Sequence, residues 1–171
     1  MFSRADLMKR GLPMVLVIIC SALVVTSPAD GYPRGGLDLG GRWSFNRIEK
    51  CLTRKLNNAR ARHGLRALNP DKQLGYVARR HARAMAATGG IYHDGDMGNE
   101  ITRWRRLGQN TGRAGGCKRA FRAFMRSSAH RGNILGRWRF VGVGAERRNG
   151  QLYVQQVFES RRDPGNVYRY P

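Results

Sequence analysis

The chain has 171 residues, and its 32 Lys or Arg against 11 Asp or Glu give a formal net charge of +21. This length suits one domain with one core. The charge predicts attraction to anionic polymers or lipid headgroups, with an arginine bias on a solvated surface as the alternative. No aromatic-interleaved nucleic-acid motif is present, so we expect no nucleic-acid partner.

Residues 1–29 have the pattern of an export signal. Basic residues at positions 4, 9 and 10 precede an apolar run over 12–25, and Ser27-Pro28-Ala29 offers small residues before a cut. The run is shorter than the roughly 20 residues of a membrane span. We therefore predict a signal peptide and a secreted, extracellular protein. The alternative is an uncleaved signal anchor that tethers the domain to the membrane.

Two helices follow a glycine-rich, flexible leader over residues 30–45. The first is expected to begin at Asn46, with Glu49 three residues later as its capping partner, and to stop at Gly64. The second is expected to open at Asn69-Pro70, because proline is tolerated in a first helical turn, and to end at Gly89.

The remainder predicts a loop, a helix and a hairpin. Residues 90–116 lack sustained periodicity and predict a loop with a short helix around 101–107. A third helix is expected over about 118–126, delivering His130, and strands on either side of Asn149-Gly150 predict a hairpin. The result is an α+β domain over residues 46–160, followed by a polar C-terminal tail over 161–171.

Three short motifs resemble the secreted CAP (SCP) domain family, the cysteine-rich secretory and pathogenesis-related group 1 superfamily, and its small bacterial branch in particular. They are Tyr92-His93-Asp94, Gly108-Gln109-Asn110 and the run His130 to Leu135 (HRGNIL), within a resemblance that covers roughly residues 47–159. The resemblance implies an α-β-α sandwich, with a central antiparallel sheet flanked by helices. It also implies that His93 and His130 line a central cavity.

Cys51 and Cys117 remain when Cys20 leaves with the signal peptide. An exported protein meets an oxidising compartment, so we predict a disulfide between the two, with two free buried thiols as the alternative.

The four histidines divide into two groups. His63 precedes Gly64 at a helix end and His81 lies on an apolar helix face, so capping and packing account for them. His93 and His130 are the candidate metal ligands, with zinc as the ion. Two imidazoles alone predict a weak or exchangeable site.

Gln109 stands where the family resemblance implies a glutamate. It keeps a carbonyl oxygen but has no negative charge and accepts no proton from water. We expect Gln109 and Asn110 to line the cleft, with Asn110 fastening the tripeptide as a loop. A second acid of larger members is absent, because residues 117–129 contain no Asp or Glu. These differences weigh against hydrolysis.

Three acids follow His93 in the sequence: Asp94, Asp96 and Glu100. They are candidates for a second shell around a metal-bound imidazole. The alternative is a polar turn that starts a helix, with Asp96 or Asn99 as its cap.

We therefore expect a secreted, non-enzymatic binding module with a His-lined cleft and a basic surface suited to an anionic envelope polymer or lipid. One alternative is a zinc-dependent hydrolase acting on a cell-wall or peptide substrate. Another is a protein of envelope adhesion or antimicrobial action that works by charge alone. Trp104 and Trp138, each flanked by arginine, are expected in the core or at its rim, with exposure at a membrane or sugar interface as the alternative. The sequence predicts no oligomeric state.

Overall fold

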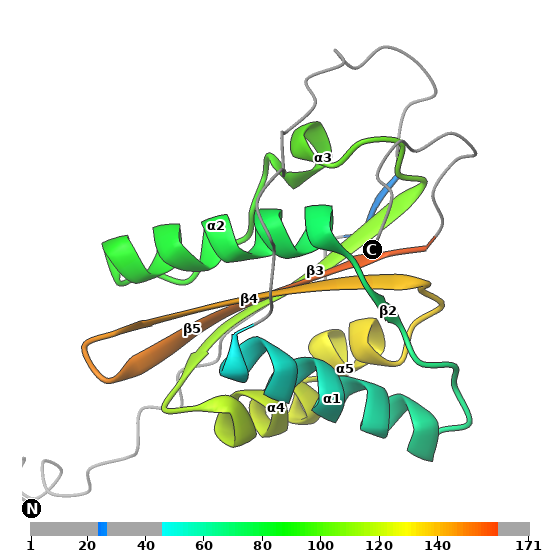
Figure 1. Cartoon of the computed structure of the whole chain (residues 1–171), viewed down its shortest axis with the longest axis horizontal. Helices are drawn as coiled ribbons and strands as arrows, with labels where there is room; N and C mark the ends of the chain where they lie inside the picture. Colours follow the sequence, from blue (N-terminus) through cyan, green and yellow to red (C-terminus); the bar gives the residue numbers. More distant parts are fainter. Residues whose placement is uncertain (1–23, 27–45, 161–171) are drawn as a thin grey trace, which may run out of the picture.

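A five-stranded sheet lies between two layers of helices in the computed structural model, which describes residues 24–26 and 46–160 (Figure 1). The strands, in chain order, are β1 (Val24–Thr26), β2 (Asn69–Pro70), β3 (Arg106–Ala114), β4 (Phe140–Arg148) and β5 (Gln151–Glu159). The helices are α1 (Arg47–Arg62), α2 (Lys72–Thr88), α3 (Met97–Glu100), α4 (Cys117–Arg126) and α5 (Ser128–Ile134). The predicted leader, tail and remaining export signal fall outside the described residues.

The strand order is β1-β3-β5-β4-β2. The three pairings β1–β3, β3–β5 and β4–β5 are antiparallel, whereas the two-residue β2 runs parallel to β4. Helix α2 covers one face, and α1, α4 and α5 cover the other (Figure 1). The predicted α+β class and α-β-α sandwich are confirmed, with the difference that β2 makes the sheet mixed.

Helix α1 begins and ends as its sequence predicts. Asn46 Oδ1 accepts hydrogen bonds from the backbone N–H groups of Ile48 and Glu49, and the Glu49 carboxylate accepts one from the Asn46 N–H at 2.9 Å. At the other end, Gly64 has a φ of 66°, a left-handed conformation that glycine adopts without a steric penalty.

The predicted start of α2 was wrong. Pro70 belongs to β2, and Asp71 caps α2 by accepting a hydrogen bond from the Leu74 N–H at 2.9 Å. The N–H groups of Asn69 and Asp71 donate to Arg139 and Val141 in or beside β4. Pro70 has no backbone N–H to donate. It fits between these two donors because neighbouring residues of a strand direct their N–H groups to opposite sides.

Two glycines bring α2 unusually close to the sheet. A Cβ at Gly142 or Gly144 of β4 would overlap the α2 backbone at Leu74 or Ala78. The apolar core on this side joins Leu74 and Val77 of α2 to Val157 of β5. A larger cluster fills the other side of the sheet, with members such as Leu52, Leu56, Phe121, Ile134 and Phe158.

The hairpin and the disulfide are both confirmed. Asn149 and Gly150 have φ angles of 48° and 72°, as a type I′ turn requires. Cys51 and Cys117 are bonded, with a Cα–Cα distance of 6.4 Å, and join α1 to α4.

The interval between α2 and α4 differs most from its prediction. The short helix is α3 at Met97–Glu100, and residues 106–114, expected within a loop, form β3 near the middle of the sheet. Five consecutive β3 residues are buried, several of them polar or glycine, so the alternation that marks a half-exposed strand is missing. Among the described residues, no helix combines the length and apolarity that a membrane crossing requires.

Candidate functional site

Strand β3 divides the tripeptide Gly108-Gln109-Asn110 between the two faces of the sheet, because successive side chains alternate along a strand. Gln109 points to the α2 face and bonds to Asp94, whereas Asn110 points to the opposite face and bonds to α5. The expectation that Asn110 fastens a loop was wrong in its setting, because the residue lies within a strand. The two amides therefore act on different parts of the site.

The Gln109 side chain is 1% exposed and locked in an amide network. Its Oε1 accepts hydrogen bonds from the Asp94 N–H at 3.0 Å and from Gln155 Nε2 at 2.9 Å. Its Nε2 donates to the Asp94 carbonyl at 3.1 Å. This paired contact fixes the backbone directly after His93, so Gln109 is placed to position that histidine's segment.

A second amide network fixes α5 and hence His130. Asn110 Nδ2 donates to the His130 carbonyl at 3.1 Å and to Gln156 Oε1 at 3.0 Å. Asn133 Nδ2 donates to the Gln109 carbonyl and to Asn110 Oδ1, each at 2.9 Å. Ser127 caps α5 by accepting a hydrogen bond from the His130 N–H. His130 lies on this separate helix rather than on a continuation of α4.

The His130 imidazole is 7% exposed and packs edge-on against Phe124, with ring centroids 4.9 Å apart. Its Nε2 is buried and has no hydrogen-bond partner among the described residues. Burial, and secondarily the charge of His93, lowers the pKa of His130. The ring is therefore neutral at pH 7, the form in which an imidazole nitrogen accepts a hydrogen bond or binds a metal.

His93 lies between α2 and α3, half-buried, and both of its ring nitrogens are buried without a partner in the described chain. The effect of His93 on the His130 pKa indicates that the two side chains are near enough to interact electrostatically. Buried polar atoms without partners are uncommon in folded proteins and call for a ligand, ion or water. No group of three or more His, Cys, Asp or Glu side chains suited to a metal occurs within residues 46–160.

The acids after His93 take part in other contacts. Asp94 accepts a hydrogen bond from Arg80 at 2.9 Å, and Arg80 also pairs with Glu100. The Asp94 Oδ1 accepts from the Asp96 N–H, so Asp94 shapes the turn, and the Asp96 side chain makes no capping hydrogen bond to α3. Asp96 therefore occupies the predicted N-cap position of α3 without the side-chain hydrogen bond of a cap.

The other two histidines have the structural roles that the sequence indicates. His81 Nε2 lies 2.8 Å from the Tyr92 carbonyl oxygen, with the ring 4% exposed. His63 is the C-cap of α1, and its Nδ1 lies 2.9 Å from the Ala59 carbonyl oxygen.

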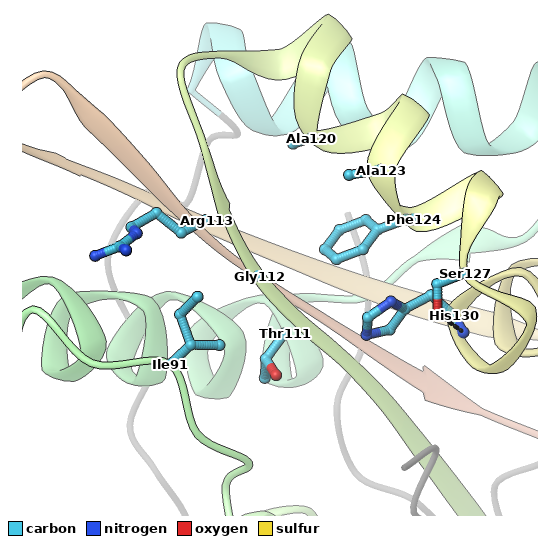
Figure 2. A pocket seen from close by; sticks show the side chains of 9 residues that line it. All are labelled: Ile91, Thr111, Gly112, Arg113, Ala120, Ala123, Phe124, Ser127 and His130. Carbon is cyan, nitrogen blue, oxygen red and sulfur yellow. Dashed lines mark hydrogen bonds between the residues drawn. The ribbon is translucent and has the colours of Figure 1, made fainter. Parts of the chain in front are cut away.

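An apolar pocket of about 140 Å³ opens beside His130 (Figure 2). Thr111 Oγ1 and His130 Nε2 are buried and have no partner in the part of the chain that the structure describes, whereas Ile91 and Phe124 supply apolar walls. The remaining lining residues are Gly112, Arg113, Ala120, Ala123 and Ser127. Figure 2 shows the Arg113 guanidinium directed away from His130.

Sequence analysis missed Thr111, Gln155 and Gln156. Two signals were available in the sequence. Positions 109 and 111 share one face of a strand, and the polar pair Gln155-Gln156 interrupts an apolar strand at its centre.

The model of the cysteine-rich secretory protein family matches residues 53–158 of the chain. No curated protein matches the chain. Three solved structures share the fold at low sequence identity. An extracellular SCP-domain protein from Bacillus anthracis str. Ames has a TM-score of 0.58 and 22% identity, over 71% of this chain and 45% of that one.

The second is an outer surface protein from Borrelia burgdorferi, with a TM-score of 0.61 and 16% identity over 66% of this chain and 92% of that one. The third is a cysteine-rich secretory protein from Staphylococcus aureus subsp. aureus Mu50, with a TM-score of 0.55 and 21% identity over 67% of this chain and 39% of that one. The chain spans less than half the length of the Bacillus and Staphylococcus proteins.

Proposed function

Because the chain belongs to the cysteine-rich secretory protein (CAP) family, we propose that it is an exported, non-enzymatic binding module whose ligand is held at His130. Export rests on the N-terminal sequence pattern and on the extracellular or outer-surface description of the structural neighbours. The proposed absence of catalysis rests on Gln109, whose amide bonds to the Asp94 backbone and to Gln155 and brings no acid to the site.

The observation that carries the proposal is an apolar pocket whose lining residues Thr111 and His130 have buried polar atoms without a partner in the described chain. A pocket of about 140 Å³ resembles in size an engineered cavity of about 150 Å³ that binds benzene. A charged ligand group would lose its hydration against apolar walls and a neutral imidazole. The ligand group that fits is a compact, neutral, apolar body with one hydroxyl that reaches Thr111 Oγ1 or His130 Nε2.

Phenol and toluene form a matched pair of probes for this pocket. We expect phenol to bind more tightly, because only its hydroxyl can satisfy the buried polar atoms. The variant Thr111→Val keeps the side-chain shape and removes the hydroxyl, so it should weaken phenol about fivefold to tenfold and leave toluene unchanged. Calorimetry or NMR titration measures both. Equal affinities of the wild type for phenol and toluene would contradict the assignment of a polar end.

A weak divalent-metal site at His93 and His130 is the second part of the proposal. Zinc calorimetry should show binding that disappears in His93→Ala and in His130→Ala but persists in His63→Ala, the matched control at an exposed helix end. Zinc binding that also persists in both cleft variants would place the ion elsewhere. Zinc-dependent turnover of a cell-wall or peptide substrate, lost in His93→Ala, would favour the hydrolase instead.

The basic surface supports a separate, electrostatic contribution to binding. With its formal charge of +21, the chain attracts anionic envelope polymers or headgroups at low salt. A protein that acted by charge alone would bind its target equally well after both histidines were replaced.

A further inference from the structure

Charge is unevenly distributed along the chain. Every Lys, Arg, Asp or Glu between Ile101 and Ala145 is a Lys or an Arg. This segment supplies β3, α4, α5 and most of β4. The ion pairs formed by α2 lie outside it and join Arg79 to Glu49, Arg80 to Asp94 and Glu100, and Arg83 to Glu146. Three of the four cations of α2 are thus paired with acids within the fold, whereas those of α4 face no acid in their own segment.

Three arginines form a stripe along the exposed side of α4: Arg119, Arg122 and Arg126, here called the arginine stripe. Their spacing of three and four residues separates them by about 4.5 Å and about 6 Å along the helix axis. Within residues 46–160 none of the three has an ion-pair or hydrogen-bond partner. Like charges at these spacings weaken a helix, so the stripe is not explained by the stability of α4.

A groove runs beside the arginine stripe. Its small residues are Ala114 and Gly115, at and just after the end of β3, and Ala123 of α4. The groove encloses about 390 Å³. Small residues leave space between the guanidinium groups, and Arg119 lies directly over Gly115. The surface is therefore concave and cationic, and its three arginines are exposed.

We propose that this groove binds a flexible polymer that carries repeated phosphate groups. Arginine is suited to phosphate because its planar guanidinium donates two parallel hydrogen bonds. Guanidinium groups in a row along one helix can each engage a successive charge of an extended chain. The proposal deepens the electrostatic part of the proposed function, and it is independent of the pocket at His130.

A polymer fits this surface better than a bilayer does. The large apolar side chains that the described residues expose are Tyr76 on α2 and Tyr92 after it, and neither lines the groove. Trp104 is buried and Trp138 half-buried, each with its indole N–H bonded to a backbone carbonyl, so neither offers an exposed interfacial anchor. Nucleic acid is disfavoured because the groove lining contains no aromatic ring on which bases could stack.

The test compares two triple variants with the same net charge. One replaces the arginine stripe (R119Q, R122Q and R126Q), and its matched control replaces three exposed arginines of α1 (R47Q, R54Q and R62Q). The probe is a poly(glycerol phosphate) chain, titrated against each protein at several salt concentrations.

We expect the stripe variant to bind about tenfold more weakly at low salt, whereas the control stays near the wild type. The slope of log affinity against log salt should fall by about 2 in the stripe variant, because three phosphate contacts are lost. Thermal melting of both variants checks the fold, and relief of like-charge repulsion should keep the stripe variant at least as stable as the control.

Three results would overturn the proposal. Equal losses in the two variants would show that net charge alone determines binding. Tighter binding to vesicles of anionic phospholipid, at equal phosphate concentration and dependent on the stripe, would identify a membrane surface. Tighter binding to single-stranded DNA than to the base-free polymer would identify a nucleic acid. All three measurements leave the phenol and zinc tests unaffected, so failure here is distinguishable from failure of the proposed function.

Discussion

Replacing Gln109 with glutamate tests whether this position serves the amide network or the cleft. In the wild type, Oε1 accepts two hydrogen bonds and Nε2 donates one to the Asp94 carbonyl at 3.1 Å. A protonated carboxyl reproduces this pattern, with its O–H as the donor. An ionised carboxylate has no donor and would place an oxygen against the Asp94 carbonyl in a site that is 1% exposed.

We therefore expect the folded state to raise the pKa of the introduced carboxyl above its ordinary value of about 4.3. The fold then binds a proton that the unfolded chain releases, so the variant loses stability relative to the wild type as pH rises. Each pH unit costs about 1.4 kcal/mol, reaching about 4 kcal/mol at pH 7 for a carboxyl that stays protonated. Near pH 4 the difference should be small.

Urea denaturation of Gln109→Glu and the wild type, at pH 4, 5, 6 and 7, measures this difference. Gln151→Glu, at an exposed residue of β5, is the matched control and should follow the wild type throughout. A Gln109→Glu variant that also follows the wild type would refute the argument. Its carboxylate would then ionise without penalty, which requires the side chain to have left Asp94.

Three further predictions concern the fold. Burial raises the pKa of Asp71 to about 7, so stability should fall as pH rises from about 4 to 7, and Asp71→Asn should abolish this slope in melting temperatures. Gly144→Ala should destabilise by at least about 3 kcal/mol in denaturant titration, because its methyl group would overlap the α2 backbone, whereas Gly132→Ala, with open space around it, should be neutral or stabilising. Reducing the Cys51–Cys117 disulfide, which closes a loop with a sequence separation of 66, should cost about 4 kcal/mol in calorimetry, and an unchanged melting temperature would contradict this.

Local rules predicted the elements whose ends are set by neighbouring residues. Asn46 and Glu49 mark the start of α1, Gly89 ends α2 in the left-handed conformation, and Asn149-Gly150 closes the hairpin. In each case a side chain or a backbone angle acts within a few residues of the boundary. Such signals survive in a single sequence because they need no information from the rest of the fold.

Long-range contacts determine what the sequence did not predict. Strand β3 is buried on both faces, and its polar residues are satisfied by partners such as Asp94, Asn133 and Gln156, so its pattern resembled a loop. Nothing in the sequence distinguishes Arg60 from the many other arginines. In the structure it is 3% exposed and donates to the carbonyls of Ile134 and Gly136. Pairing of such groups becomes visible only after the chain has folded.

The candidate site shows the same division. The motifs identified His93 and His130, and His93 affects the pKa of His130. Thr111 and the pocket wall at Phe124 depend on where β3 lies against α4, which follows from the strand that sequence analysis missed.

The pairing of β1 with β3 has a consequence for the predicted processing of the chain. Residues Val24–Thr26 align with Arg106–Gly108, and they precede the predicted cut after Ala29. Processing there would remove β1 and leave the backbone donors and acceptors at the start of β3 without their strand neighbour. An exposed edge strand can pair with a strand of another chain, and proteins commonly prevent this with charged side chains. The nearby cations Arg103, Arg105 and Arg106 would place positive charge beside that edge, which opposes its pairing with a second copy of this basic chain.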